Sequence, residues 1–201
     1  MKILFLDHDS VICLYDQFSG RFKKQMKYSK ENPNISRKDY PVSVRFDNFD
    51  KKAIKVLNEI IEETNCEIVV SSDWKHHATL EEMGDYYTEQ GIIKRPIDFT
   101  PRFKDIIPRK HSMVLRWRSA KLEIERTFEI NHWIENHPEV TQWVAVDDLN
   151  MSTEHLMGKF HYTETPDKPE DIGVENFVHI PRQYEGIKQS GIKEKILKYL
   201  L

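Results

Sequence analysis

The hydrophobic and polar positions of this chain follow two kinds of pattern. Short apolar runs, typical of buried strands, occupy residues 2–7, 66–72 and 141–148. Between them, residues 49–65 and 123–140 repeat apolar side chains three and four positions apart, which predicts amphipathic helices. A further apolar run at 176–180 and an amphipathic segment at 191–201 follow. Strands alternating with helices in this way predict an α/β fold with a parallel sheet flanked by helices.

Residues 14–48 separate the first predicted strand from the first predicted helix. A connection of this length is too long for a simple turn, so we expect a flap or small cap inserted into a single domain of residues 1–201. Between Phe18 and Arg45 the insertion is rich in Lys and Arg and contains only Glu31 and Asp39 as acids. Aromatic residues interleaved with these charges suit a phosphate backbone and its bases, and a second basic run at 101–118 would extend the surface. A solvated flap with a few core aromatics explains the same composition equally well.

Composition narrows the class of protein. The 201 residues suffice for one core, and a net charge of −3 does not mark the whole chain as a binder of nucleic acid or membranes. Only Cys13 and Cys66 are present, far apart, which predicts neither a disulfide framework nor a zinc cluster and fits a reducing cytoplasm. No apolar run approaches the ~20 residues of a membrane helix, so we expect no signal peptide, no membrane partner and a cytoplasmic location.

Each of the three apolar runs is followed at once by small polar or acidic residues: Asp7 and Asp9, Ser71 and Ser72, and Asp147 and Asp148. Because the carboxyl ends of parallel strands share one edge of a sheet, these side chains should converge. Four carboxylates gathered there would repel one another unless they bind a cation. Oxygen ligands without a His or Cys set favour Mg²⁺ over zinc.

Three motifs in this order resemble those of the haloacid dehalogenase (HAD)-like phosphatase superfamily. They are "LDHDSVI", "IVVSS" and "VAVDD". An Asp after a strand is commonly only a turn or cap residue, but the shared order of the motifs favours the functional interpretation. The stretches "VVSSDWK", "RTFEINHWIENHPEV" and "WVAVDDLNM" further resemble the HAD domain of Swiss Army Knife RNA-repair proteins. The chain departs from the superfamily at Ser10, where Gly is frequent, and in the long insertion.

The resemblance implies a Rossmann-like sheet and a division of chemical roles. Asp7 would attack phosphorus, Asp9 would serve as general acid and base, and Ser71 would hydrogen-bond the transferring phosphoryl group. The residues implied as holding Mg²⁺ are Asp7, Asp9, Asp147 and Asp148.

The resemblance also implies a fixed cation. Arg126 and Lys121 are the candidates, and Arg126 fits the pattern of the relatives better. Both would be solvated helix residues under the simpler interpretation. Ser72 suits a structural role better than a catalytic one. The expected substrate contacts are Ser72, Lys75, Lys23 and Lys24.

The sequence therefore predicts a Mg²⁺-dependent phosphomonoesterase that forms an aspartyl-phosphate. Its expected partner is a phosphorylated substrate, either the terminal phosphate of an RNA or DNA strand or a nucleotide. A phosphatase of small metabolites such as sugar phosphates, and a non-catalytic nucleic-acid-binding or regulatory module on the same fold, are the alternatives. The oligomeric state is open, and a monomer is favoured.

Overall fold

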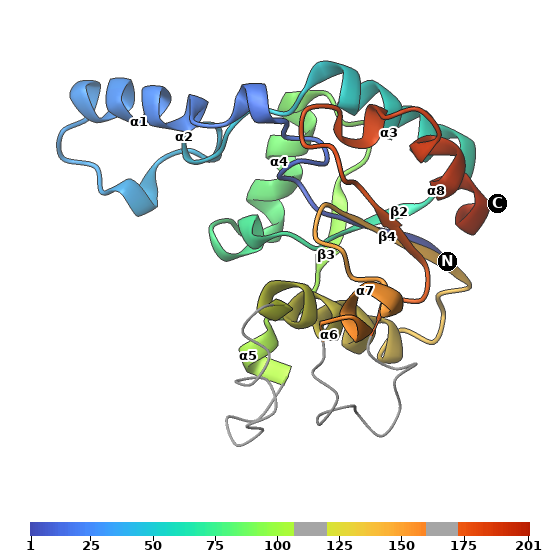
Figure 1. The fold of residues 1–201 in the computed structure, drawn as a ribbon. Helices are drawn as coiled ribbons and strands as arrows, with labels where there is room; N and C mark the ends of the chain where they lie inside the picture. The colour runs from blue at the N-terminus through green and yellow to red at the C-terminus, as the bar shows by residue number, and fades with distance from the viewer. Residues whose placement is uncertain (107–119, 160–172) are drawn as a thin grey trace.

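The computed structural model describes residues 1–106, 120–159 and 173–201. Its strands form a five-stranded, all-parallel sheet in the order β3-β2-β1-β4-β5 (Figure 1). The strands are β1 (Lys2–Leu6), β2 (Glu67–Val70), β3 (Pro96–Phe99), β4 (Gln142–Asp147) and β5 (Phe177–His179). The predicted α/β, Rossmann-like architecture is confirmed.

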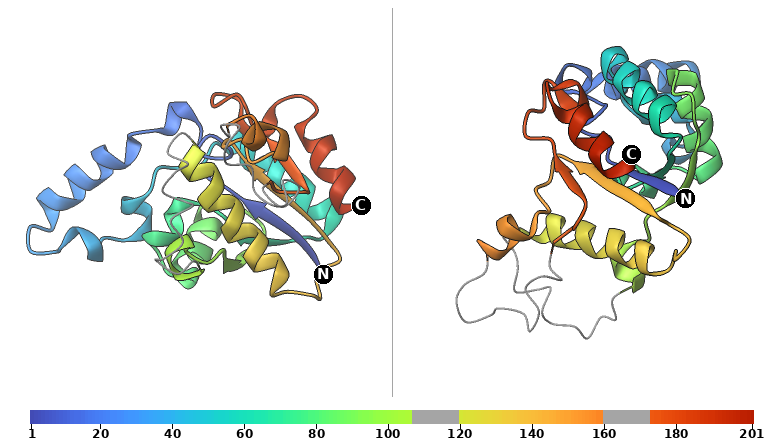
Figure 2. Two further views of the ribbon diagram at one scale, coloured as in Figure 1. Left: turned by 60° about the horizontal axis from the view of Figure 1, so that its bottom comes forward. Right: turned by 90° about the vertical axis from the view of Figure 1, so that its right-hand side faces the viewer.

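Helices cover both faces of the sheet (Figure 2). One face carries α3 (Lys51–Thr64), α4 (Leu80–Gln90) and α8 (Ile192–Leu200), and the other carries α5 (Phe103–Ile106), α6 (Lys121–Glu135) and α7 (Thr153–Met157). Side chains alternate along β1, so that Leu4 and Leu6 join the core on the α3 side while Ile3 and Phe5 join the core on the α6 side. A parallel sheet buried on both faces requires such apolar strands, which is why β1 reads as a continuous hydrophobic run.

Four elements outside the insertion are not predicted by the hydrophobic pattern: β3, α4 and the short helices α5 and α7. The strand β3 begins at Pro96 and lies at the edge of the sheet, where a residue without an N–H group is tolerated. Helix α4 is weakly apolar, and it begins with a capping box in which Thr79 and Glu82 satisfy each other's backbone N–H groups. Short 3-10 turns complete the described elements: η1 (Tyr15–Gln17), η2 (Arg37–Asp39), η3 (Asp73–His76) and η7 (Gly186–Lys188). No helix within the described ranges is long and apolar enough to cross a membrane.

The insertion after β1 forms an arm that projects from the body (Figure 1). We use the name arm for residues 20–45, which contain α1 (Gly20–Glu31), η2 and α2 (Val42–Arg45). The ammonium of Lys24 donates to the carbonyl oxygen of Ser43 at 2.7 Å, which ties α1 to α2. The rings of Tyr28 and Tyr40 pack edge to face with centroids 4.9 Å apart. These contacts fix the shape of the arm although α1 buries none of its residues.

Candidate active site

The register of the sheet brings three of the predicted residues to one level. Leu6 pairs with Val70 on β2 and with Val146 on β4. The residues that follow these three positions are therefore neighbours at the carboxyl edge of the sheet: Asp7, Ser71 and Asp147. Strand order reverses at β1, because β2 and β4 lie on opposite sides of it, and ligand crevices form at such a point in open α/β sheets.

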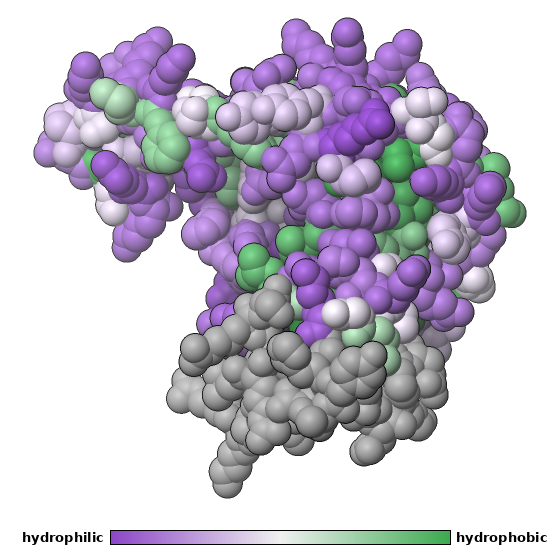
Figure 3. Space-filling model, in the orientation of Figure 1, coloured by the Kyte–Doolittle hydropathy of each residue, from purple (hydrophilic) through white to green (hydrophobic). Residues whose placement is uncertain are grey.

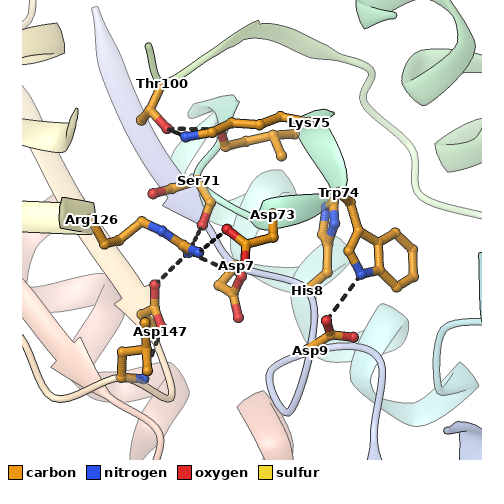
Figure 4. A network of polar contacts seen from close by, with 12 residues as sticks. Asp7, His8, Asp9, Ser71, Asp73, Trp74, Lys75, Thr100, Arg126 and Asp147 are labelled. Carbon is orange, nitrogen blue, oxygen red and sulfur yellow. Dashed lines mark hydrogen bonds and ion pairs between the residues drawn. The ribbon is translucent and has the colours of Figure 1, made fainter. Parts of the chain in front are cut away.

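Arg126 of α6 joins these strand ends (Figure 4). Its Nη1 atom lies 3.2 Å from Asp7 Oδ1 and 2.9 Å from Asp147 Oδ2, and it also donates to the carbonyl oxygen of Ser71. Its Nη2 atom lies 3.2 Å from Asp73 Oδ1. Burial alone would lower the pKa of Arg126, but the surrounding carboxylates raise it, so the guanidinium is permanently charged. One buried cation thus orients the predicted nucleophile.

A cluster of three carboxylates lies at the same edge. One oxygen atom from each of Asp7, Asp147 and Asp148 falls within 4.8 Å of the others. Burial, followed by repulsion from Asp147, raises the pKa of Asp7 well above its ordinary value, and burial raises the pKa of Asp147 to about 7. Carboxylate oxygens that are held together despite their mutual repulsion are suitable ligands for Mg²⁺. In proteins this ion usually binds one or two carboxylates directly and completes its coordination shell with water and phosphate oxygens. The side chains present therefore suit the implied metal.

Asp9 occupies a different environment from Asp7. Its Oδ2 atom accepts a hydrogen bond from Trp74 Nε1 at 3.1 Å, and its carboxylate is not part of the three-residue cluster (Figure 4). Burial raises the pKa of Asp9, and the bond from Trp74 offsets part of this rise. Trp74 is itself held by stacking on Phe46, with ring centroids 4.4 Å apart. The two predicted catalytic carboxylates thus have separate partners.

The turn that separates Asp7 from Asp9 is built by backbone bonds. The carbonyl oxygen of His8 accepts the N–H groups of Val11, Ile12 and Cys13. Ser10 has φ = 63°, the left-handed region that favours glycine, which accounts for the frequent Gly at this position of the superfamily motif. The His8 ring is buried against aromatic side chains, and burial lowers its pKa to about 3, so it is a neutral packing residue.

The hydroxyls of Ser71 and Ser72 are both buried, and neither has a hydrogen-bond partner among the described residues. A buried hydroxyl without a partner costs stability, and it is therefore a group that a ligand can satisfy. Ser71 shares its level with Asp7, since its N–H donates to the carbonyl oxygen of Leu6 at 3.0 Å. The position of Ser71 agrees with the expected contact to a phosphoryl group.

Lys75 is committed to partners in the protein. Its Nζ atom lies 2.5 Å from Glu129 Oε2, 2.7 Å from Thr100 Oγ1 and 3.2 Å from the carbonyl oxygen of Pro101. An ammonium has three protons to donate, so these contacts saturate it. Glu129 also accepts the N–H of Phe103 at 2.8 Å. In this structure Lys75 therefore fixes the segment after β3, and its expected contact with substrate stays a prediction.

The remaining sequence candidates lie away from the carboxylates. The side chain of Lys121 is 58% exposed and pairs with Glu125 at 3.5 Å. Lys23 is exposed on α1, and Lys24 also donates to Asn48 at 2.8 Å. The structure thus brings Arg126, not Lys121, to the carboxylates. Much of the second basic run, residues 107–118, lies outside the described residues.

Three residues near the site were not predicted as site residues from the sequence: Asp73, Trp74 and Glu129. Glu129 follows Arg126 by three positions on a predicted helix, a spacing that places both side chains on one face, so it was within reach of sequence reasoning. Trp74 belongs to the quoted stretch "VVSSDWK", but nothing in that stretch predicts its contact with Asp9, which depends on how the turn after β1 is placed.

A cleft of about 810 Å³ adjoins Asp9. It is lined from the arm by Arg21 and Phe22, among others, and from the body by residues that include Trp74 and Thr79. A cleft of this size lies within the range of ligand sites, and it gives a bound molecule access to Asp9.

Comparison with known proteins gives one match. The model of a family described as the HAD domain in Swiss Army Knife RNA repair proteins matches residues 3–166. No curated protein and no solved structure matches the chain. The matched range contains all of the strand-end residues described above.

Proposed function

The chain belongs to the family of HAD domains found in Swiss Army Knife RNA repair proteins, and from this we propose that it is a Mg²⁺-dependent phosphomonoesterase. Its substrate is the terminal phosphate of a polynucleotide or a nucleotide. The observation that carries the proposal is the single guanidinium of Arg126, which bridges Asp7 and Asp147 at the carboxyl edge of the sheet. This is the arrangement that an anchored nucleophile and a charged phosphoryl group require.

Asp7 is the nucleophile of the proposed reaction. One of its carboxylate oxygens forms a bond to phosphorus while the bond from phosphorus to the leaving oxygen breaks, which gives an aspartyl-phosphate. Arg126 favours the ionised form of Asp7 and holds it in place at 3.2 Å. Ser71, whose hydroxyl has no partner in the part of the chain that the structure describes, donates to a phosphoryl oxygen. Such positioning and charge stabilisation supply most of the catalysis in phosphoryl transfer.

Asp9 moves the proton in both steps. In the first step it gives its proton to the leaving oxygen. In the second it takes a proton from water as the water oxygen bonds to phosphorus, and the bond from phosphorus to Asp7 breaks to release inorganic phosphate. Burial raises the pKa of Asp9, which favours the protonated form that the first step needs. The bond from Trp74 holds the carboxyl in one orientation through both steps.

Asp7, Asp147 and Asp148 would hold the metal. When bound, Mg²⁺ supplies positive charge that offsets the carboxylates and the phosphoryl oxygens. Asp147 is oriented by Arg126 and by the N–H of Leu149, which donates to its Oδ1 atom at 2.8 Å.

Release of inorganic phosphate tests the proposal. Wild type, Asp7→Asn and the surface control Asp85→Asn are compared on p-nitrophenyl phosphate, on sugar phosphates and on 3′- and 5′-phosphorylated oligonucleotides, with Mg²⁺ or EDTA. We expect Asp7→Asn and EDTA each to lower the rate at least ~1,000-fold, equivalent to about 4 kcal/mol in the barrier, and Asp85→Asn to behave as wild type. Mass spectrometry after an acid quench should find phosphate on Asp7, with more of it in Asp9→Asn. Appreciable turnover by Asp7→Asn would rule out the covalent mechanism, and a preference for sugar phosphates would rule out the polynucleotide.

A further inference from the structure

The cleft beside Asp9 has an excess of basic side chains. Its lining includes six cationic residues: Arg21, Arg37, Lys38, Arg45, Lys75 and Arg102. The acids in its lining are Asp9, Asp73 and Glu82. The space-filling view shows a mostly hydrophilic arm standing off the body (Figure 3). A concave basic surface next to a phosphate-transfer site favours a ligand with more than one negative charge.

The cations of the cleft differ in how far the protein itself neutralises them. Arg45 pairs with Glu82, and Lys75 pairs with Glu129. Arg37 and Lys38 are exposed on η2 and have no carboxylate partner in the described part of the chain. A bound phosphate would therefore meet these two side chains without displacing an internal ion pair. Arg37 and Lys38 are therefore the basic residues of the arm that are most available to a ligand, since Arg21 lies 3.8 Å from Asp47.

An exposed aromatic ring lies among these charges. Phe22 lines the cleft and is 56% exposed, and the guanidinium carbon of Arg21 lies 5.5 Å from its ring centroid. Met26, one turn further along α1, is 63% exposed and is not among the residues that line the cleft. Aromatic rings next to phosphate-binding cations stack on the bases of single-stranded nucleic acid. The exposed ring of Phe22 therefore favours a ligand that has bases as well as phosphates.

The cleft is preformed because the arm is tied to the body. The backbone N–H of Arg21 donates to Asp47 at 2.5 Å, and the ammonium of Lys24 donates to Asn48 at 2.8 Å. Arg45 links the other end of the arm to α4 through Glu82. Because the arm is already ordered, binding a ligand costs little conformational entropy, and the affinity for a given set of contacts is higher.

We propose that this cleft binds a single strand of nucleic acid whose terminal phosphate is the one that Asp7 attacks, with Arg37 and Lys38 on its internal phosphates and Phe22 stacked on a base. The inference rests on the proposed function and narrows its substrate from any nucleotide to a polynucleotide end. A mononucleotide has no internal phosphate for Arg37 and Lys38. A duplex keeps its bases stacked on one another and out of reach of Phe22.

Two charge-reversal variants of the arm test the role of the basic residues. The first double variant carries Arg37→Glu and Lys38→Glu. The control double variant carries Lys27→Glu and Lys30→Glu, which makes the same change of charge on exposed residues outside the cleft lining. The measured quantity is kcat/KM on a phosphorylated ten-nucleotide strand divided by kcat/KM on p-nitrophenyl phosphate. We expect this ratio to fall at least tenfold in the first variant and less than twofold in the second. The slope of log(kcat/KM) against log[salt] for the strand should become shallower by about 1.4 in the first variant.

A second pair of variants tests the aromatic contact. Phe22→Ala should weaken the reaction with the ten-nucleotide strand severalfold and have little effect when the terminal nucleotides are abasic, since the ring then has no base to contact. Met26→Ala removes a similarly exposed apolar side chain from the same helix and should leave both substrates as in wild type. Equal losses on the normal and abasic strands would exclude stacking by Phe22.

Several outcomes would overturn the proposal. These are equal effects of the two charge-reversal variants, equal kcat/KM of wild type for a nucleoside monophosphate and the strand, or equal kcat/KM for a blunt duplex and the strand. If wild type releases no phosphate even from p-nitrophenyl phosphate, the proposed function fails separately from the cleft. In that case the affinity of the cleft for nucleic acid is measured by fluorescence anisotropy with a labelled, unphosphorylated ten-nucleotide strand. We expect Arg37→Glu with Lys38→Glu to weaken this binding more than Lys27→Glu with Lys30→Glu, and Phe22→Ala to weaken it more than Met26→Ala. Absence of binding in that assay would overturn the cleft proposal as well.

Discussion

The guanidinium of Arg126 lies 3.2 Å from the carboxylate of Asp7, although the two residues are 119 positions apart in the chain. Two independent features produce this contact. The register of β1 with its neighbours sets the level of Asp7, and the apolar residues of α6, such as Ile130 and Trp133, set which face of the helix meets the sheet. Arg126 lies on the buried part of α6, so its charge is directed at the strand ends.

Substitutions at Arg126 and at Lys121 should show which of these two residues supplies the fixed cation that the sequence predicts. Arg126→Lys keeps the charge but loses the planar guanidinium, whose Nη1 contacts Asp7 and Asp147 while Nη2 contacts Asp73, and we expect kcat to fall at least ~100-fold, or about 2.7 kcal/mol. Lys121→Met should change kcat less than twofold, because that ammonium pairs with Glu125 at the surface. Steady-state kinetics on p-nitrophenyl phosphate with Mg²⁺ make the comparison. The opposite ranking of the two variants would assign the cation to Lys121.

Sequence reasoning reached the residues whose position depends on strand ends alone. Asp7, Ser71 and Asp147 each follow an apolar run, and parallel pairing at matched register then brings them together. The carboxylate cluster could therefore be predicted without knowing any side-chain contact. The order of the same motifs indicated the family that the match over residues 3–166 confirms.

The residues that sequence reasoning missed depend on tertiary packing. Trp74 donates to Asp9 from a position that is fixed by stacking on Phe46 and Phe49, at and just after the end of the insertion. Thr100 follows β3, an edge strand that begins with Pro96 and leaves little hydrophobic alternation to detect. The saturation of Lys75 could not be predicted while the position of Thr100 was unknown.

Ser71 and Ser72 offer a test in which activity and stability should separate. Both hydroxyls are buried without a partner among the described side chains, so removing either one should not lower the free energy of unfolding. Ser71→Ala should nevertheless reduce kcat/KM about 10- to 100-fold, since a hydrogen bond to a charged phosphoryl oxygen contributes ~1.5–3 kcal/mol. Thermal unfolding and kinetics are measured on the same samples.

Ser72→Ala is the matched control, because it removes the same group from the adjacent position. We expect it to keep kcat/KM within a few fold of wild type and to have an unchanged or slightly higher Tm. An equal loss of activity in both variants would place the phosphoryl contact on both hydroxyls. A large drop in Tm for Ser71→Ala would instead reveal a structural hydrogen bond.

Binding of Mg²⁺ should stabilise the protein more at pH 8 than at pH 6. Burial raises the pKa of Asp147 to about 7 and holds that of Asp7 well above its ordinary value. The stability contributed by protonating such groups is fully present below the ordinary carboxylate pKa of about 4 and is lost as the pH rises through about 7. At pH 8 the ionised carboxylates repel one another, so bound Mg²⁺ removes the largest repulsion there. At pH 6 Mg²⁺ must first displace protons from the carboxyl groups, which weakens its binding.

Differential scanning fluorimetry measures this effect. With Mg²⁺ at about 100 times its Kd, the gain is ~2.7 kcal/mol, which corresponds to a rise in Tm of about 5–10 °C for a chain of this size at pH 8. The rise should be smaller at pH 6 and at least halved at pH 8 in Asp148→Asn, while Asp85→Asn keeps the full effect. An equal rise at both pH values, or an undiminished rise in Asp148→Asn, would exclude this cluster as the metal site.

The buried pair of Lys75 and Glu129 should be far more sensitive than an exposed pair of similar length. Their side chains are 2% and 9% exposed, whereas Arg95 and Asp85 pair at 2.7 Å on the surface. Lys75→Met leaves a buried carboxylate with only the 3.9 Å contact to Arg126, and Glu129→Leu leaves a buried ammonium without its anion, so each should lower the free energy of unfolding by ~3–5 kcal/mol. Arg95→Ala should cost at most ~1 kcal/mol.

The double variant Lys75→Met with Glu129→Leu decides whether the two residues act as a pair. The double variant leaves no unpaired buried charge from this pair. Its loss in the free energy of unfolding, measured with urea, should therefore be well below the sum of the losses of the two single variants. Additive losses would show that Thr100 and Phe103 hold the two side chains independently. Because Glu129 also lies 3.9 Å from Arg126 Nε, the double variant should in addition lower kcat more than KM changes, as expected for a network that positions the guanidinium at Asp7.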